Sequence, residues 1–287
     1  MKQQHVDYQV VPYPKIRRFL AIELRSSHHM PMIHGLIEVD VSKARAHLRE
    51  YKAHTGEALS FTAFLIACLA QAVEEHKAVQ AMRKGRKHLL LFEDVDVYLP
   101  IEHDVAGQKQ PMPYILRAAN RKTVCEIHRE IRAAQVRGVT KDVMRFQSLP
   151  TLLFQPYLWI FTWVGRTHPR LWKKAVGTVG ITAVGMFGKG AGWGIPPALP
   201  TLMMTVGGIS EKPGVVDGHI AIRDYLSLTI SFDHDIIDGA PAARFTQRLK
   251  DLIESGYGLP DSTLKSEQAG AEAASMQQVE ATHTALP

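Results

Sequence analysis

Cysteine is scarce in this sequence, since only Cys68 and Cys125 occur among 287 residues. Two cysteines cannot form the disulfide framework of a small secreted domain. Both lie in apolar, helix-like patterns, which favours small buried side chains in a reducing compartment. No cluster of cysteine, histidine and acidic residues has metal-ligand spacing, so we expect no metal site.

Export and lipidation signals are also lacking. The N-terminal sequence MKQQHVDYQVVPYPKIRRF contains no apolar stretch of the kind found in secretory signals, so we expect a cytoplasmic protein. The formal charge is +6, but the basic residues are scattered and no known module interleaves them with aromatics. We therefore expect no nucleic-acid partner, and the mild positive charge fits an anionic cosubstrate or a membrane surface.

The composition, with 46% hydrophobic and 22% charged residues, is that of an ordinary globular protein. No internal repeat or linker divides residues 1–260, which predicts a single domain. From Asp261 onward the sequence is small, polar and aperiodic, so residues 261–287 are predicted to form a disordered tail.

Hydrophobic periodicity predicts an α+β domain with a mixed sheet flanked by helices. Polar residues are placed to cap three of the helices: Ser42, Ser60, and Thr123 with Glu126 in a capping box. The predicted helices cover residues 15–29, 43–56, 61–79, 123–135 and 239–256. The predicted strands cover residues 32–42, 88–92, 95–103, 178–184, 202–209 and 219–232.

One apolar stretch, LPTLLFQPYLWIFTWVG at residues 149–165, does not fit a plain domain. It is short for a membrane span and is interrupted by two prolines. A buried pair of helices is one interpretation, and an interfacial membrane anchor or the wall of an acyl tunnel are two others. The last two suit its tryptophans and the basic residues that follow it. These are Trp159, Trp163, Arg166, Arg170, Lys173 and Lys174.

The stretch SLTISFDHDIIDGAPAARF places His234 at the end of an apolar strand and Asp238 at the start of a helix. Free imidazole titrates near about pH 6.5, so a histidine held on rigid backbone can accept and return a proton at neutral pH. Asp238 can cap the helix or hold an arginine. Spacing alone leaves a second interpretation open, in which His234 is a structural histidine and Asp238 is only a cap.

The same stretch resembles the HxxxDG signature of the catalytic domain of dihydrolipoamide acyltransferases, which chloramphenicol acetyltransferases share. Other segments resemble that domain in the same order, across roughly residues 14–256 except about 139–175. They are IRRFLAIEL, MIHGLIEVDVSKARAHL, SFTAFLIACLAQAVEEHKAVQA, AANRKTVCEIHREI, GTVGITAVGMFG and TVGGISEKPGVVDGHIAIRDYLSLTISFDH. The resemblance implies a chloramphenicol acetyltransferase-like fold for residues 1–260, with an apolar insertion at about 139–175.

The resemblance also implies roles for three residues. His234 matches the general base that deprotonates a thiol of coenzyme A or dihydrolipoamide. Asp238 matches the aspartate that orients the active-site loop, with Arg17 or Arg18 as a candidate partner. Thr182 stands where the family has a serine that stabilises the oxyanion, and threonine keeps the hydroxyl.

The implied function is a stand-alone acyltransferase that moves an acyl group between a coenzyme A thioester and a thiol, amine or hydroxyl acceptor. Coenzyme A is the cosubstrate, and we expect no covalent lipoyl site in this chain. The implied assembly is a homotrimer with active sites between subunits. A lipoyl or acyl-carrier partner and a peripheral membrane contact are further expectations.

Asp235 stands where the family usually has arginine, which reverses a charge beside the site. That reversal, Thr182 and the expected lack of a lipoyl arm favour a second hypothesis, a non-catalytic scaffold or regulatory homologue. A condensation domain of peptide synthesis shares the histidine and the aspartate but needs about twice this length for its two lobes.

Overall fold

The computed structural model describes residues 9, 11, 13, 30–85, 87–105, 108–137, 168–185, 190–197 and 200–261. The predicted helix at residues 15–29, the apolar stretch at 149–165 and nearly all of the predicted tail lie outside the described residues. Within the described ranges, no helix combines the length and the hydropathy that crossing a membrane requires.

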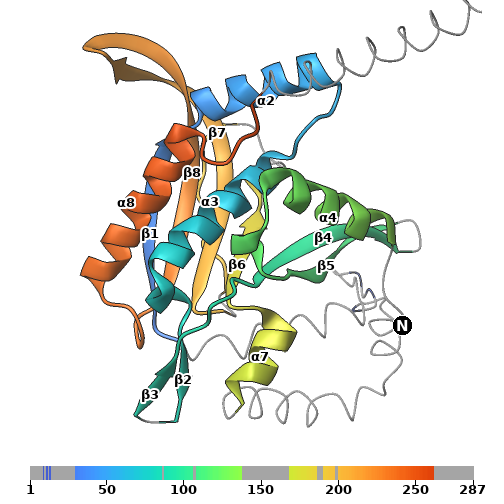
Figure 1. Ribbon diagram of the computed structural model, residues 1–287, viewed down its shortest axis with the longest axis vertical. Helices are drawn as coiled ribbons and strands as arrows, with labels where there is room; N and C mark the ends of the chain where they lie inside the picture. Colours follow the sequence, from blue (N-terminus) through green and yellow to red (C-terminus); the bar gives the residue numbers. More distant parts are fainter. Residues whose placement is uncertain are drawn as a thin grey trace, which may run out of the picture.

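A six-stranded sheet forms the centre of the fold, with strand order β1-β8-β7-β6-β4-β5 (Figure 1). Strand β6 is parallel to β4 and to β7, and the other neighbouring pairs are antiparallel. The strands are β1 (Met32–Asp40), β4 (Val97–Val105), β5 (Gln108–Leu116), β6 (Val179–Ala183), β7 (Leu202–Val216) and β8 (His219–Asp233). This arrangement confirms the predicted mixed sheet.

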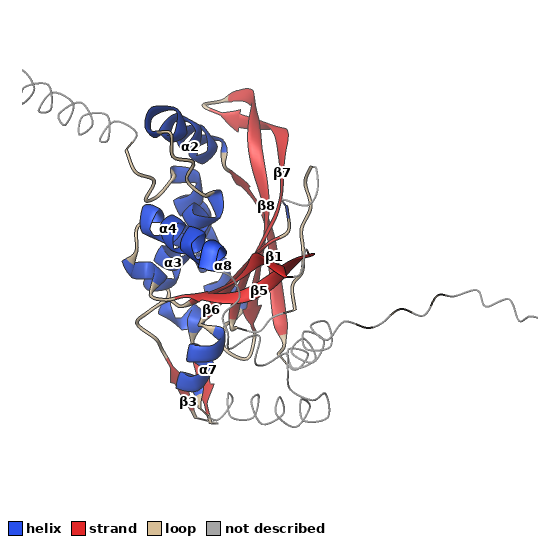
Figure 2. Ribbon diagram, turned by 90° about the vertical axis from the view of Figure 1, so that its right-hand side faces the viewer, coloured by secondary structure: helices blue, strands red, loops and turns tan. Residues whose placement is uncertain are grey.

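Helices cover one face of the sheet, called here the helix face (Figure 2). They are α2 (Ser42–Thr55), α3 (Phe61–Glu75), α4 (Val124–Arg137) and α8 (Gly239–Ser255). Aromatic rings join the layers, because Phe245 of α8 meets Phe232 of β8 edge-to-face, with 5.7 Å between the ring centroids. Phe245 is fully buried and also contacts His76 at the end of α3. The helices and the sheet therefore share one core.

The second face of the sheet is also partly covered. The Gly192 carbonyl accepts from the Gly208 amide at 3.1 Å, and the Trp193 indole donates to the Ile37 carbonyl at 3.1 Å. A Cβ atom at Gly207 would lie 2.0 Å from the Gly192 oxygen, so this crossing requires glycine there. Residues 190–197 thus run across β7 towards β1.

The helix ends follow the predicted caps in two of three cases. The Ser60 hydroxyl accepts from the Ala63 amide, and Thr123 and Glu126 form the reciprocal capping box. The prediction for Ser42 is wrong, because Val41 occupies the N-cap position of α2. The Ser42 hydroxyl instead accepts from the Asp224 amide on β8 at 2.8 Å.

Several elements were not predicted. They are strand β5, strand β2 (Met82–Lys84), helix α7 (Pro169–Val176), and the 3-10 turns Lys77–Gln80 and Ala119–Arg121. Strand β2 forms a short hairpin with β3 (His88–Leu90), which lies within the predicted strand at 88–92. Strand β5 contains Pro111 and Pro113, which argue against a strand from sequence alone. It lies at the edge of the sheet, where missing amide donors are tolerated.

Strands β7 and β8 extend beyond the sheet as a two-stranded arm, residues 213–222 (Figure 1). Asp217 and Gly218 connect the strands, and both have positive φ, which fits a two-residue hairpin turn. Val215, Ile220 and Ile222 are each at least 76% exposed, and their pairing places them on one face of the arm. This apolar face packs against no other part of the described chain.

Candidate functional site

His234 directly follows the last residue of β8. Its backbone amide donates to the Pro31 carbonyl at 2.8 Å, and the preceding amide of Asp233 donates to the Thr201 carbonyl at 2.9 Å. These two bonds tie the end of β8 to the residues that precede β1 on one side and β7 on the other. The His234 side chain is 46% exposed. The imidazole is therefore held on rigid backbone with access for a substrate.

Asp238 is the N-cap residue of α8, as predicted, but its side chain makes no capping hydrogen bond. The expectation that its carboxylate caps the helix is thus wrong. The carboxylate is 87% exposed, and its Oδ1 lies 3.7 Å from Nδ1 of His234. This is ion-pair distance, longer than a hydrogen bond. The candidate partners Arg17 and Arg18 lie outside the described residues.

Asp235 forms an ion pair that sequence analysis missed. Its Oδ2 lies 2.9 Å from Nη1 of Arg83 on β2, and both side chains are about half exposed. The reversed charge beside His234 is therefore matched by a cation from a segment 152 positions away. The sequence shows a basic run around Arg83 but no sign that it lies near residue 235.

Asp233 completes the acidic turn, and only 7% of it is exposed. Its Oδ1 accepts from the Asp235 amide at 3.1 Å. Burial raises the pKa of the Asp233 carboxyl, while the Asp235 amide and the Arg83 charge act in the opposite direction. Through its bond to the Asp235 amide, this carboxyl holds the backbone of the turn.

Thr182 lies in the middle of β6 and is half-buried. In the register it pairs with Thr205 of β7, which pairs with Thr229 of β8. The neighbouring Ile181 belongs to the core, so the three threonines lie on the second face of the sheet. The hydroxyls of Thr205 and Thr229 are buried and form no hydrogen bond within the described chain.

The chain does not bring Thr182 and His234 together. His234 lies five residues beyond Thr229 on β8, which is about 16 Å at 3.3 Å per residue, and β8 is two strands from β6. A hydroxyl on Thr182 therefore cannot reach a reaction at His234 of the same chain. That the two groups meet between different chains stays a prediction.

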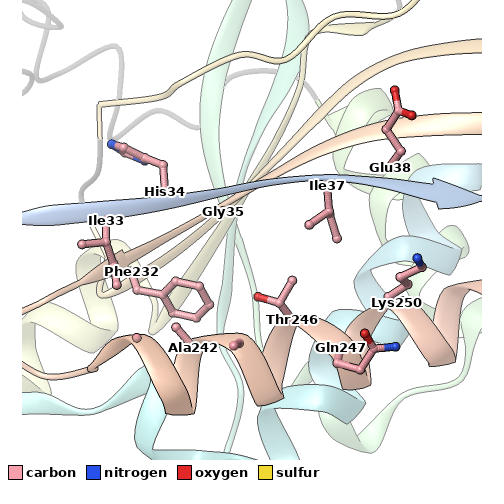
Figure 3. Close-up of a pocket in the computed structure, with 12 residues that line it drawn as sticks. Ile33, His34, Gly35, Ile37, Glu38, Phe232, Ala242, Thr246, Gln247 and Lys250 are labelled. Carbon is pink, nitrogen blue, oxygen red and sulfur yellow. The ribbon is translucent and has the colours of Figure 1, made fainter.

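A groove of about 550 Å³ lies between edge strand β1 and helix α8 (Figure 3). Apolar side chains such as Ile33, Ile37 and Phe232 form its base, and Thr246 and Lys250 of α8 lie along its rim. Neither His234, Asp238 nor Thr182 lines it. The described residues also contain no group of three or more His, Cys, Asp or Glu side chains placed to hold a metal ion.

Comparison with known proteins identifies relatives of this chain. The chain is 27% identical over 251 residues to the lipoamide acyltransferase component of the branched-chain alpha-keto acid dehydrogenase complex of Bacillus subtilis. It is 26% identical over 256 residues to the succinyltransferase component of the 2-oxoglutarate dehydrogenase complex of Bartonella vinsonii. The matches cover 85% and 88% of this chain but only 52% and 55% of those proteins. The chain thus spans about half the length of these curated relatives.

Solved structures share the fold. One described as a probable dihydrolipoamide acetyltransferase from Listeria monocytogenes has a TM-score of 0.65 and 22% identity, covering 88% of this chain and 96% of that one. The cubic core of a pyruvate dehydrogenase multienzyme complex has a TM-score of 0.65 and 20% identity, covering 87% and 93%. The predicted fold class is therefore confirmed.

A family model for the 2-oxoacid dehydrogenases acyltransferase catalytic domain matches residues 5–145 and 174–259. The gap between the two matched parts falls inside the predicted insertion at about 139–175, although the domain boundaries themselves stay a prediction. Since the match covers most of its length, this chain belongs to the family of 2-oxoacid dehydrogenase acyltransferase catalytic domains.

Proposed function

We propose that this chain is a coenzyme A-dependent acyltransferase in which His234 is the general base. The observation that carries the proposal is the half-exposed imidazole at the end of β8, with the Asp238 carboxylate 3.7 Å from its Nδ1. With Nδ1 towards this carboxylate, Nε2 is the nitrogen available to a substrate. The named relatives are acyltransferase components of 2-oxoacid dehydrogenase complexes, which suggests a thiol as the acceptor.

In the proposed reaction, Nε2 of His234 accepts the proton of the acceptor thiol. The thiolate adds to the carbonyl carbon of the coenzyme A thioester, and the carbonyl oxygen becomes an oxyanion. The Thr182 hydroxyl of a neighbouring copy donates a hydrogen bond to this oxyanion. When the intermediate collapses, the carbon–sulfur bond to coenzyme A breaks and His234 returns the proton to the departing sulfur.

The test is acyl transfer by the purified chain. Acetyl-, isobutyryl- and succinyl-coenzyme A are each incubated with dihydrolipoamide, and the acylated product is measured by mass spectrometry. We expect transfer with at least one donor, well above that of heat-inactivated protein. Lack of transfer with every donor, together with no heat of coenzyme A binding, would instead favour the non-catalytic scaffold or regulatory homologue.

We further propose that the chain forms a homotrimer with the active site between subunits. Two observations support this assembly. His234 and Thr182 are too far apart to act together within one chain, and the arm at residues 213–222 exposes an apolar face. A two-stranded ribbon is marginally stable by itself in water, so cover from a neighbouring subunit would stabilise the arm.

Disruption of the arm tests the assembly. The double variant Ile220→Asp/Ile222→Asp places two charges on the apolar face, so we expect light scattering to give the mass of one chain instead of three, with loss of transfer. Val136→Asp, a charge at an exposed apolar position of α4, is the control and should remain a trimer. A monomeric wild type, or a double variant that stays trimeric, would contradict the proposal.

The remaining expectations stay predictions. The peripheral membrane contact concerns residues 149–164, outside the described residues, and flotation with anionic liposomes would test it. Whether a lipoyl or acyl-carrier partner delivers the acyl group, and whether the chain acts in a stand-alone form, would be tested by comparing free dihydrolipoamide with a lipoyl domain as acceptor. The cytoplasmic location and the lack of a nucleic-acid partner are likewise predictions.

A further inference from the structure

The turn that carries His234 contains an unusual number of carboxyl groups. Asp233, Asp235 and Asp238 lie within four residues of His234 in the sequence, and Arg83 forms an ion pair with Asp235. Asp233 is buried and its pKa is raised, chiefly by burial, while Asp235 and Asp238 face solvent. A carboxylate beside a base keeps that base protonated to higher pH, so the charge of Asp235 matters for proton transfer.

Arg83 reaches this turn from the β2–β3 hairpin, whose position is fixed by Thr201. The buried Thr201 hydroxyl donates to the Ala81 carbonyl at the foot of the hairpin at 2.7 Å. The Thr201 carbonyl accepts from the Asp233 amide in the turn at 2.9 Å. One residue therefore holds both the hairpin and the turn, and the Arg83–Asp235 pair is a second connection between the same two segments.

We propose that Arg83 is a positioning residue for His234. Arg83 pairs with Asp235, holds the turn and offsets the negative charge next to the base. This inference rests on the proposed function for its effect on catalysis, but the contact itself does not. Because both side chains are about half exposed, the pair contributes little to folding. Its loss should therefore change proton transfer more than stability.

Three variants separate the charge effect from a structural one. Arg83→Gln leaves the Asp235 carboxylate unpaired, so the acidic limb of the kcat/KM profile should move to higher pH by about half a unit, the size expected for a half-exposed pair. Asp235→Asn removes the negative charge and should move the limb to lower pH. The charge exchange Arg83→Asp/Asp235→Arg rebuilds the pair and should restore kcat/KM towards the wild-type value.

The control is Lys84→Gln, which removes the next cation along the same hairpin, one that makes no ion pair within the described chain. It should leave the profile unchanged. Movement of the limb in the same direction for Arg83→Gln and Asp235→Asn, or equal profiles for Arg83→Gln and Lys84→Gln, would overturn the proposal. A general loosening of the turn cannot produce opposite movements.

A second readout does not depend on activity. In protein labelled at the histidine ring carbon, the His234 signal is titrated by NMR in wild type and in the same variants without substrate. The midpoint should rise in Arg83→Gln and fall in Asp235→Asn. If the His234 midpoints of the two variants move in opposite directions in a protein without transferase activity, the Arg83 proposal holds and the acyltransferase proposal fails. If wild type and variants have equal midpoints in an active protein, the Arg83 proposal alone is overturned.

Discussion

His234→Ala is expected to lower kcat/KM for acyl transfer by about 10²- to 10⁴-fold, the usual contribution of a general base. Alanine cannot accept the thiol proton, so only the small thiolate fraction already present in solution can attack. The backbone bond from residue 234 to the Pro31 carbonyl does not involve the side chain and should persist. Steady-state kinetics with a confirmed donor and acceptor measure the effect.

Folding is checked in the same experiment. The thermal midpoint of His234→Ala should stay close to that of wild type, because the side chain is 46% exposed and packs little. His54→Ala is the matched control, since His54 is an exposed histidine on α2 whose one hydrogen bond in the described part of the chain is to a carbonyl of its own helix. Wild-type transfer by His234→Ala would show that the histidine is structural.

Thr182→Val is expected to slow transfer by about two orders of magnitude, because the loss of one oxyanion donor costs about 3 kcal/mol in the transition state. Valine keeps the branched shape of threonine and deletes only the hydroxyl. Thr182→Ser keeps the donor and should preserve or raise the rate. Single-turnover kinetics with saturating acyl-coenzyme A measure the chemical step directly.

Thr205→Val is the control for this experiment. Thr205 is the neighbour of Thr182 in the register, and its hydroxyl is buried without a hydrogen bond in the described chain. Replacing that hydroxyl with a methyl group should leave the rate unchanged and stability equal or higher. If Thr182→Val behaves in the same way as Thr205→Val, Thr182 is a strand residue without a role in the reaction.

Mixed assemblies extend the test to the proposed shared site. His234→Ala and Thr182→Val chains are denatured together, refolded and assayed. If each site takes its histidine and its threonine from different chains, some sites in the mixed trimers carry both wild-type residues and activity should return. No recovery, with mixed trimers shown by native mass spectrometry, would contradict the proposed shared site.

Local sequence determined much of the architecture. The strand periodicity of LTISF predicts the core-facing side of β8, and the spacing of Phe245, Leu249 and Leu252 predicts the buried face of α8. Thr123 and Glu126 define a helix start because both partners of the capping box lie within one turn. Patterns of this kind need only neighbouring residues, so they can be read before any fold is known.

Tertiary structure decided the rest of the site. The Arg83–Asp235 pair joins residues 152 positions apart, and no local pattern marks it. The local sequence predicts Ser42 as a helix cap, but in the fold its hydroxyl accepts a hydrogen bond from the Asp224 amide of β8. The sequence determined that His234 follows a buried strand and resembles a known base. The pairing register of β6, β7 and β8 decided that Thr182 lies too far away to act with it in the same chain, because register depends on how whole strands pack.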